Sequence, residues 1–190
     1  LTLVFVPQVV RVAESVTTQV RQRDYVDAAR LSGAGAFSII RVHVLGNVLG
    51  PVFVYASGLV SVSMLLASGL SFLLGLGFNQ VVLLFVHRLR PYDVGISHLL
   101  VERSADFSFP SDHATASVAI ATAFLLHGLK HQGLAFLGAA VLVAVSRVYI
   151  GTHFLGDVLG GTITGVAAAA AVRATYREGT RADRLITGLF

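Results

Sequence analysis

Long apolar stretches separated by short polar segments run through most of the chain. Residues 51–87 contain no Asp, Glu, Lys or Arg. Because a helix needs about 20 residues to cross a ~30 Å hydrocarbon core, this stretch predicts one crossing with residues to spare. Later apolar runs predict helices over residues 114–129, 134–149 and 154–172, with a polar turn at 130–132. We therefore expect an all-α, multi-pass membrane protein, a bundle of helices within the lipid bilayer.

Composition supports this prediction and removes several classes of function. Of the 190 residues, 55% are hydrophobic and only 13% are charged, unlike a soluble domain. There is no cysteine, which excludes a disulfide framework, a thiolate metal site and a cysteine nucleophile. The net charge of +4 comes from basic residues grouped at 11–41 and 173–184, beside apolar runs. This grouping is typical of cytoplasmic loops, so no nucleic-acid partner is expected.

Loop charges also predict which segments share a side of the membrane. If the basic segment 173–184 is cytoplasmic, the turn at 130–132 is cytoplasmic too. Segments 87–113 and 150–153 then lie together on the outer side. The interpretation is a protein of the bacterial plasma (inner) membrane with these two segments on its extracytoplasmic face.

Polar residues that are costly in a membrane segment occur within residues 146–157, which read S-R-V-Y-I-G-T-H-F-L-G-D. Arg147, His153 and Asp157 each need a partner or a function at such a place. Gly151 is expected to break one helix, so that Thr152 caps the next and His153 lies in its first turn. Asp157 then follows one turn later on the same face.

Two further polar pieces are predicted to lie on the same side. Arg90 and Pro91 close one helix, and P-S-D-H at 110–113 opens another, which leaves His113 in a first turn with free backbone N–H groups. Arginine forks and helix N-termini both suit a phosphate group. We assign the attack on phosphorus to His153, since Asp157 can orient it, and the acid role to His113. Alternatively, His153 and Asp157 form a structural pair.

The order R-P, then P-S-x-H, then S-R-x5-H-x3-D resembles the three-part signature of the type-2 phosphatidic acid phosphatase superfamily. The resemblance implies hydrolysis through a phosphohistidine on His153, without a metal or another cofactor. It implies that the phosphate is gripped by three residues, Arg90, Arg147 and Ser111. Two neighbours are further candidates, Asp112 and Ser146.

F-N-Q at 78–80 and A-D-F-S-F at 105–109 resemble a narrower branch of that superfamily, the bacitracin-resistance undecaprenyl-pyrophosphate phosphatases. This resemblance covers residues 78–172. It implies a hydrolase of phosphoric or diphosphoric anhydrides or monoesters that serves cell-wall biogenesis. The expected substrate is a polyprenyl or other lipid phosphate, and the expected site lies at the helix ends on one membrane face.

The first 77 residues resemble a different family, the dipeptide-type ABC transporter permeases. Residues 24–52 resemble the coupling loop of that family through Ala28, Ala29, Gly33, Ile40 and Asn47. The alternative function is therefore a fragment of a peptide permease that couples to a separate ATPase subunit. An amphipathic interfacial segment would explain the same residues. We interpret the chain as a permease-like segment, 1–77, joined by fusion or truncation to a phosphatase-like bundle with a basic tail, 78–190.

Overall fold

The structure, a computed structural model, describes residues 2–97, 103, 104 and 106–175, with side chains from residue 5 onward. Every regular element among these residues is helical, which confirms the predicted all-α class. Contacts divide the chain into two compact units, one built on residues 1–63 and the other on residues 64–177. The division of the chain at residues 77 and 78 stays a prediction.

The first unit begins with α1 (Thr2–Arg21) and α2 (Asp24–Leu31). A short helix, α3 (Ala36–Ile39), continues through one π-helical turn, η1 (Ile40–Val44), which lies against α1. A break separates these two helices, because α1 ends at Arg21 and a new helix starts at Asp24. Asp24 and Asp27 occupy the first turn of α2, where carboxylates favour a helix start.

The charge-free stretch forms one helix, as predicted, but this helix ends at Leu83, so Arg90 and Pro91 lie beyond it and do not close it. Helix α4 (Leu45–Leu83) is 39 residues long and contains Pro51. Together with the helical turns before it, residues Ala36–Leu83 form one of three segments that, among the described residues, are long and apolar enough to cross a membrane. The other two are Lys130–Tyr149 and Leu155–Thr175.

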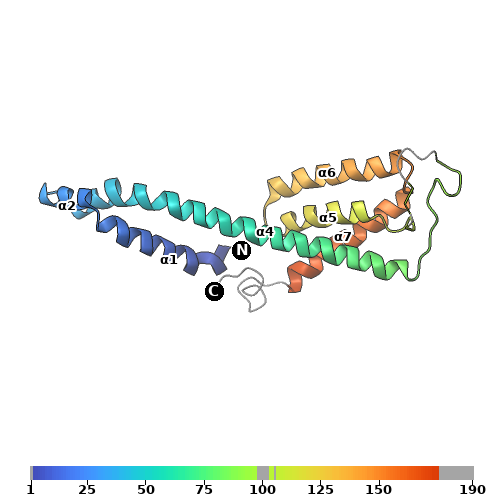
Figure 1. Cartoon of the computed structure of the whole chain (residues 1–190), viewed down its shortest axis with the longest axis horizontal. Helices are drawn as coiled ribbons and strands as arrows, with labels where there is room; N and C mark the ends of the chain where they lie inside the picture. The colour runs from blue at the N-terminus through green and yellow to red at the C-terminus, as the bar shows by residue number, and fades with distance from the viewer. Residues whose placement is uncertain (1, 98–102, 105, 176–190) are drawn as a thin grey trace. The chain divides into compact units, whose positions relative to one another are not determined.

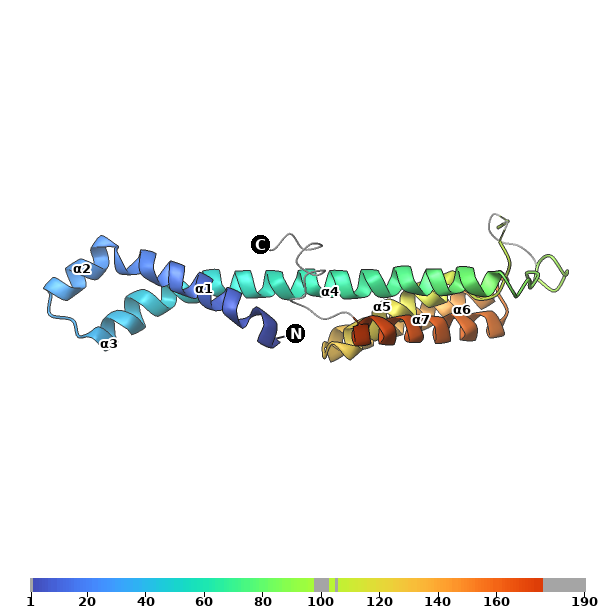
Figure 2. The same cartoon turned by 90° about the horizontal axis from the view of Figure 1, so that it is seen from below.

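The second unit contains α5 (Asp112–Leu126), α6 (Lys130–Tyr149) and α7 (Leu155–Thr175). Helix α5 lies between α6 and α7 and contacts both extensively (Figure 1). The C-terminal half of α4 runs alongside these three helices (Figure 2). The predicted turn at 130–132 is wrong by three residues. The chain turns at residues 127–129 because Gly128 adopts a positive φ of 85°, and the polar residues that follow form the first turn of α6.

Glycines allow α7 to approach α5 closely. A Cβ atom on Gly161 would lie 2.5 Å from the Ser111 carbonyl oxygen, and one on Gly165 would lie 2.6 Å from the Thr115 carbonyl oxygen. Small residues spaced four apart bring membrane helices together in this way. The close approach puts the start of α5 beside the start of α7, where the Ser111 N–H donates to the Asp157 carbonyl oxygen at 3.0 Å.

Helix α4 joins this pair through a buried amide. The Asn79 side chain donates to the Asp112 carboxylate at 2.6 Å and to the Thr115 hydroxyl at 2.9 Å. The Thr115 hydroxyl in turn lies 3.0 Å from that of Thr164 on α7. Because buried polar groups need partners, this chain of contacts aligns three helices near the N-terminus of α5.

The connection between α4 and α5 meets the connection between α6 and α7 at one end of this unit. The Arg90 guanidinium donates to the Thr152 carbonyl at 3.3 Å, and the Ser97 hydroxyl donates to the Gly151 carbonyl at 2.8 Å. The prediction that these two connections lie on the same side is confirmed. The side of the membrane on which they lie stays a prediction.

Candidate active site

The turn before α7 holds the first component of the site, His153. Gly151 has a positive φ of 75°, which reverses the chain after α6. The Arg147 carbonyl then accepts from the Thr152 hydroxyl at 3.0 Å and from the His153 N–H at 3.3 Å. Contrary to the prediction, Thr152 thus closes α6 instead of capping α7. His153 lies just before α7, which begins at Leu155.

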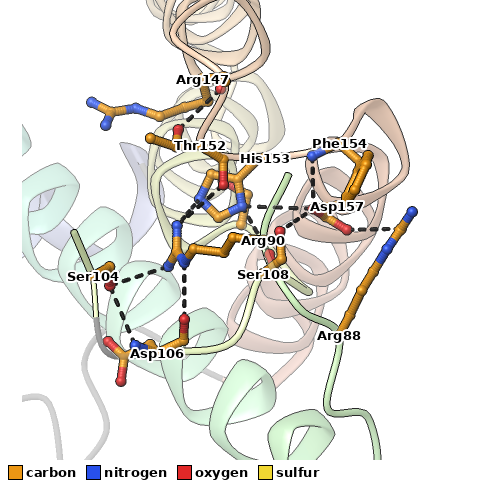
Figure 3. A network of polar contacts seen from close by, with 12 residues as sticks. Arg88, Arg90, Ser104, Asp106, Ser108, Arg147, Thr152, His153, Phe154 and Asp157 are labelled. Atoms are coloured by element: carbon orange, nitrogen blue, oxygen red, sulfur yellow. Dashed lines mark hydrogen bonds and ion pairs between the residues drawn. The ribbon is translucent and has the colours of Figure 1, made fainter. Parts of the chain in front are cut away.

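The imidazole of His153 is buried and held at both nitrogens. Its Nδ1 lies 2.8 Å from the carbonyl oxygen of Ser108, and its Nε2 lies 3.3 Å from the Arg90 guanidinium (Figure 3). Because a carbonyl only accepts, Nδ1 must carry the proton in this contact. The neutral ring therefore has its lone pair on Nε2, next to a cation.

The surroundings of His153 favour that neutral form. The residue lies in the turn between α6 and α7, outside both helices. Burial lowers the pKa of its imidazole below the ordinary value, and the positive charges of Arg90 and His113 lower it further. The Ser108 carbonyl and the Asp157 carboxylate act in the opposite direction without reversing the shift. A neutral imidazole is the nucleophilic form.

Arg90 is anchored by neutral acceptors. Its Nε donates to the Asp106 carbonyl oxygen at 2.9 Å, and its two terminal nitrogens donate to the Thr152 carbonyl and the Ser104 hydroxyl, each at 3.3 Å. The side chain is buried, and no carboxylate pairs with it within the described part of the chain. Its charge is therefore directed at the Nε2 side of His153 without a counter-ion, which suits an incoming anion.

Asp157 was expected to orient His153 directly, but its carboxylate is engaged elsewhere. One oxygen accepts from the Arg88 guanidinium at 2.9 Å. The other accepts from the Ser108 hydroxyl and from the Phe154 N–H, the latter at 2.8 Å. This second oxygen is 3.8 Å from His153 Nδ1, which is too long for a hydrogen bond.

The start of α5 contributes Ser111 and His113. Ser111 is the N-cap, and its buried hydroxyl has no hydrogen-bond partner among residues 5–97, 103, 104 and 106–175. His113 occupies the first turn of α5, as predicted, and is exposed. An unpaired buried hydroxyl next to an exposed imidazole leaves one donor and one proton source available to a ligand.

Arg147 is near these groups but is not hydrogen-bonded to them through its side chain. Its Nε is buried, and nothing in the described part of the chain accepts from it. The two secondary candidates have other partners. The Ser146 hydroxyl donates to the Val143 carbonyl of its own helix, and the Asp112 carboxylate accepts from Asn79.

The structure adds Arg88 and Ser108 to the residues predicted from the sequence. Arg88 pairs with Asp157 and stacks over the Phe154 ring, 4.2 Å from its centroid. Ser108 contacts both His153 and Asp157. Arg88 lies two residues before Arg90, and Ser108 lies three residues before Ser111, so the sequence indicated that both are close to the site. Such spacing does not show whether a residue belongs to a buried hydrogen-bond network or to an exposed loop.

Comparison with known proteins supports the resemblance drawn from the motifs. The profile of the PAP2 superfamily matches residues 61–181. The undecaprenyl-diphosphatase BcrC of Bacillus subtilis (strain 168) is 34% identical over 101 residues, 53% of this chain and 52% of BcrC. Phosphatidylglycerophosphatase B of the same organism is 33% identical over 144 residues, 70% of this chain and 65% of that protein. The matched region thus spans about half the length of BcrC.

A crystal structure of a transmembrane PAP2-type phosphatidylglycerolphosphate phosphatase from Bacillus subtilis is 28% identical to the chain. It aligns with a TM-score of 0.48 over 94% of this chain and 90% of that chain.

A second group of relatives confirms the resemblance to peptide permeases as a partial match. A putative peptide transport system permease protein of Brucella suis biovar 1 (strain 1330), BRA1093/BS1330_II1085, is 39% identical over 77 residues. These residues are 40% of this chain but only 26% of the permease.

Proposed function

The chain belongs to the PAP2 superfamily, and from this premise we propose that it is a membrane phosphatase that hydrolyses a polyprenyl pyrophosphate. The observation that carries the proposal is the imidazole of His153, whose Nδ1 is held by the Ser108 carbonyl while its Nε2 faces the Arg90 guanidinium at 3.3 Å. The nucleophilic nitrogen lies beside a cation, and that cation has no carboxylate partner in the described structure. Attack on a phosphoryl group needs this arrangement, because the free cation can bind the phosphoryl oxygens.

In the first step, the Nε2 lone pair of His153 attacks the terminal phosphorus. A P–N bond forms as the bond between phosphorus and the leaving oxygen breaks. His113, at the exposed start of α5, donates its proton to that oxygen. Arg90 and Arg147 offset charge on the phosphoryl oxygens, and the Ser111 hydroxyl donates to one of them.

In the second step, water displaces the imidazole. Neutral His113 takes a proton from the water as its oxygen bonds to phosphorus, and the P–N bond breaks. Inorganic phosphate leaves, and His153 returns to its neutral form with the proton still on Nδ1. The residues described here supply the nucleophile, the acid and the cations of both steps.

The substrate class follows from the surroundings of the site and from the relatives. Three segments in the described part of the chain have the length and composition to cross a bilayer, and the site lies at the N-terminal ends of α5 and α7. A phosphate carried on a membrane lipid would reach such a site from the headgroup region. The BcrC relative is named an undecaprenyl-diphosphatase, which supports a polyprenyl pyrophosphate, whereas phosphatidylglycerophosphatase B is named for a glycerolipid phosphate, so the test below compares both classes.

The test is phosphate release by the purified chain in detergent, with EDTA present. The substrates to compare are undecaprenyl pyrophosphate, undecaprenyl phosphate and phosphatidylglycerol phosphate. We expect the highest kcat/KM for the pyrophosphate, and we expect His153→Gln to abolish turnover. Full activity of His153→Gln would exclude the phosphohistidine route, and no release from any of the three lipids by the wild-type chain would exclude the function.

Ser111→Ala separates substrate binding from folding. Because the hydroxyl is buried without a partner in the described structure, its removal should leave the free energy of unfolding unchanged or slightly raised. The loss of a donor to a phosphoryl oxygen should lower kcat/KM by about tenfold or more. An unchanged kcat/KM would remove Ser111 from the phosphate site, and Ser71→Ala, in a buried part of α4, is the matched control.

A further inference from the structure

Ser108 makes three hydrogen bonds that join separate parts of the site. Its N–H donates to the Arg88 carbonyl at 2.8 Å, and its hydroxyl donates to the second carboxylate oxygen of Asp157. Its carbonyl accepts from His153 Nδ1 at 2.8 Å. The side chain is fully buried, so these contacts are shielded from water.

The geometry leaves His153 no direct bond to Asp157. Nδ1 has one proton to donate, and the Ser108 carbonyl is 1.0 Å closer to it than the nearest carboxylate oxygen, 2.8 Å against 3.8 Å. That oxygen already accepts two hydrogen bonds, from Ser108 and Phe154. Any effect of Asp157 on the position of the imidazole must therefore pass through the residues that it holds.

We propose that Ser108 is a positioning residue through which Asp157 acts on His153. The Asp157 carboxylate fixes the hydroxyl end of Ser108, and the Arg88 carbonyl fixes its N–H. Between them they aim the Ser108 carbonyl at Nδ1. The proton then stays on Nδ1, and the Nε2 lone pair stays on the side of Arg90. The effect of this positioning on catalysis rests on the proposed function. The location of the His153 proton on Nδ1 does not depend on that function.

Arg88 completes this network as the counter-ion of Asp157. A fully buried carboxylate is unfavourable without a paired charge, and the Arg88 guanidinium supplies that charge at 2.9 Å. The same guanidinium stacks on Phe154, whose N–H also binds the carboxylate. Figure 3 shows Arg88 on the opposite side of Asp157 from His153, so Arg88 is not directed at the Nε2 side of the ring.

A double-mutant cycle of Ser108→Ala and Asp157→Asn tests the relay. Each change alone should lower kcat by about 10- to 100-fold with little change in KM, because a hydrogen bond to a charged group is lost while the phosphate ligands stay. The double variant should be no slower than the slower single variant, since both remove the same link. Losses that multiply would show that Asp157 acts independently of Ser108 and would overturn the proposal.

Nitrogen-15 NMR of histidine-labelled protein provides a readout that does not need activity. The chain has seven histidines, and His153→Gln identifies the signal of interest. We expect the wild-type ring to carry its proton on Nδ1. Ser108→Ala and Asp157→Asn should each reduce that population, and the double variant should reduce it no further. A His153 signal that changes in Asp157→Asn but not in Ser108→Ala would contradict the relay.

Two controls separate positioning from folding. Ser71→Ala removes another fully buried serine hydroxyl, bonded only to its own helix at the Ala67 carbonyl, and should leave kcat and the His153 signal unchanged. If Ser108→Ala does not purify as a single species, Ser108→Cys keeps the shape and weakens the donor. The same non-additivity with Asp157→Asn is then expected, and multiplied losses again overturn the proposal. A wild-type chain inactive on all lipids, with the Nδ1 tautomer intact, would refute the proposed function alone.

Discussion

At the residue scale, the site combines two differently paired charges. Arg90 has no carboxylate partner in the described structure, whereas Asp157 is paired with an arginine. Arg90 is held by carbonyl and hydroxyl oxygens, so its charge remains available beside His153 Nε2. Asp157 is paired with Arg88, so its charge is largely offset. The imidazole therefore lies in a net positive environment, which favours its neutral form and favours an anion next to it.

This environment predicts the acidic limb of the pH profile. Since the pKa of His153 is lowered by burial and by Arg90, the neutral nucleophile persists at pH values below the ordinary 6.5 of histidine. Activity should be lost only as pH falls through that lowered pKa. In Arg90→Gln one cause of the shift is gone, so the acidic limb of the residual kcat/KM should move to higher pH.

The matched control for this prediction is Arg103→Gln. Arg103 is an exposed arginine paired with Asp93, and its loss should leave the limb in place. A limb that stays unchanged in Arg90→Gln, or that moves to lower pH, would contradict the assignment of this limb to His153.

At the element scale, the distance between α5 and α7 determines whether the three sequence pieces meet. Gly161 and Gly165 let the backbone of α7 approach that of α5, which brings the Ser111 N–H to the Asp157 carbonyl. A wider separation would carry Ser111 and His113 away from His153. Helix packing is therefore a condition of the chemistry as well as of stability.

Gly165→Val is expected to destabilise the protein by about 1–3 kcal/mol, because its Cβ would lie 2.6 Å from a backbone oxygen of α5, which cannot move aside as a side chain can. Unfolding followed by circular dichroism in detergent measures the effect. Gly138→Val is the matched control, since a Cβ there meets nothing within 4 Å in the described structure. Equal stability of the two variants would show that α5 and α7 tolerate a wider separation.

At the scale of the whole molecule, the orientation in the membrane decides which pool of lipid reaches the site. The connections that carry Arg90 and His153 meet at one end of the second unit, and the turn before Lys130 joins α5 and α6 at their opposite ends. Loop charge predicts that the first end lies outside the cell. A site on that face would act on lipid phosphates exposed on the outer surface.

The absence of cysteine from the sequence makes this orientation directly measurable. Ile96→Cys and Lys130→Cys each introduce one exposed thiol, at opposite ends of the helices. We expect a membrane-impermeant maleimide to label only Ile96→Cys in intact spheroplasts and to label both variants after permeabilisation. Labelling of Lys130→Cys alone in intact cells would invert the orientation and place the site in the cytoplasm.

The hydrophobic pattern of the sequence by itself determined the all-α class, the single long helix α4 and the approximate limits of α5, α6 and α7. It did so because a bilayer imposes length and apolarity on every crossing segment. It also predicted that His113 lies in a first turn, since Pro110 and Ser111 form a local helix-start signal. These features depend on neighbouring residues, so they can be derived from the chain alone.

Tertiary structure decided how the polar groups pair. The i, i+4 spacing of His153 and Asp157 predicted a direct contact, yet His153 lies before α7 and binds the Ser108 carbonyl, 45 residues away in sequence. The charge partner of Asp157 is Arg88, which lies 69 residues away in sequence. A buried hydrogen bond depends on which donors and acceptors packing brings within about 3 Å, and local spacing does not encode that distance.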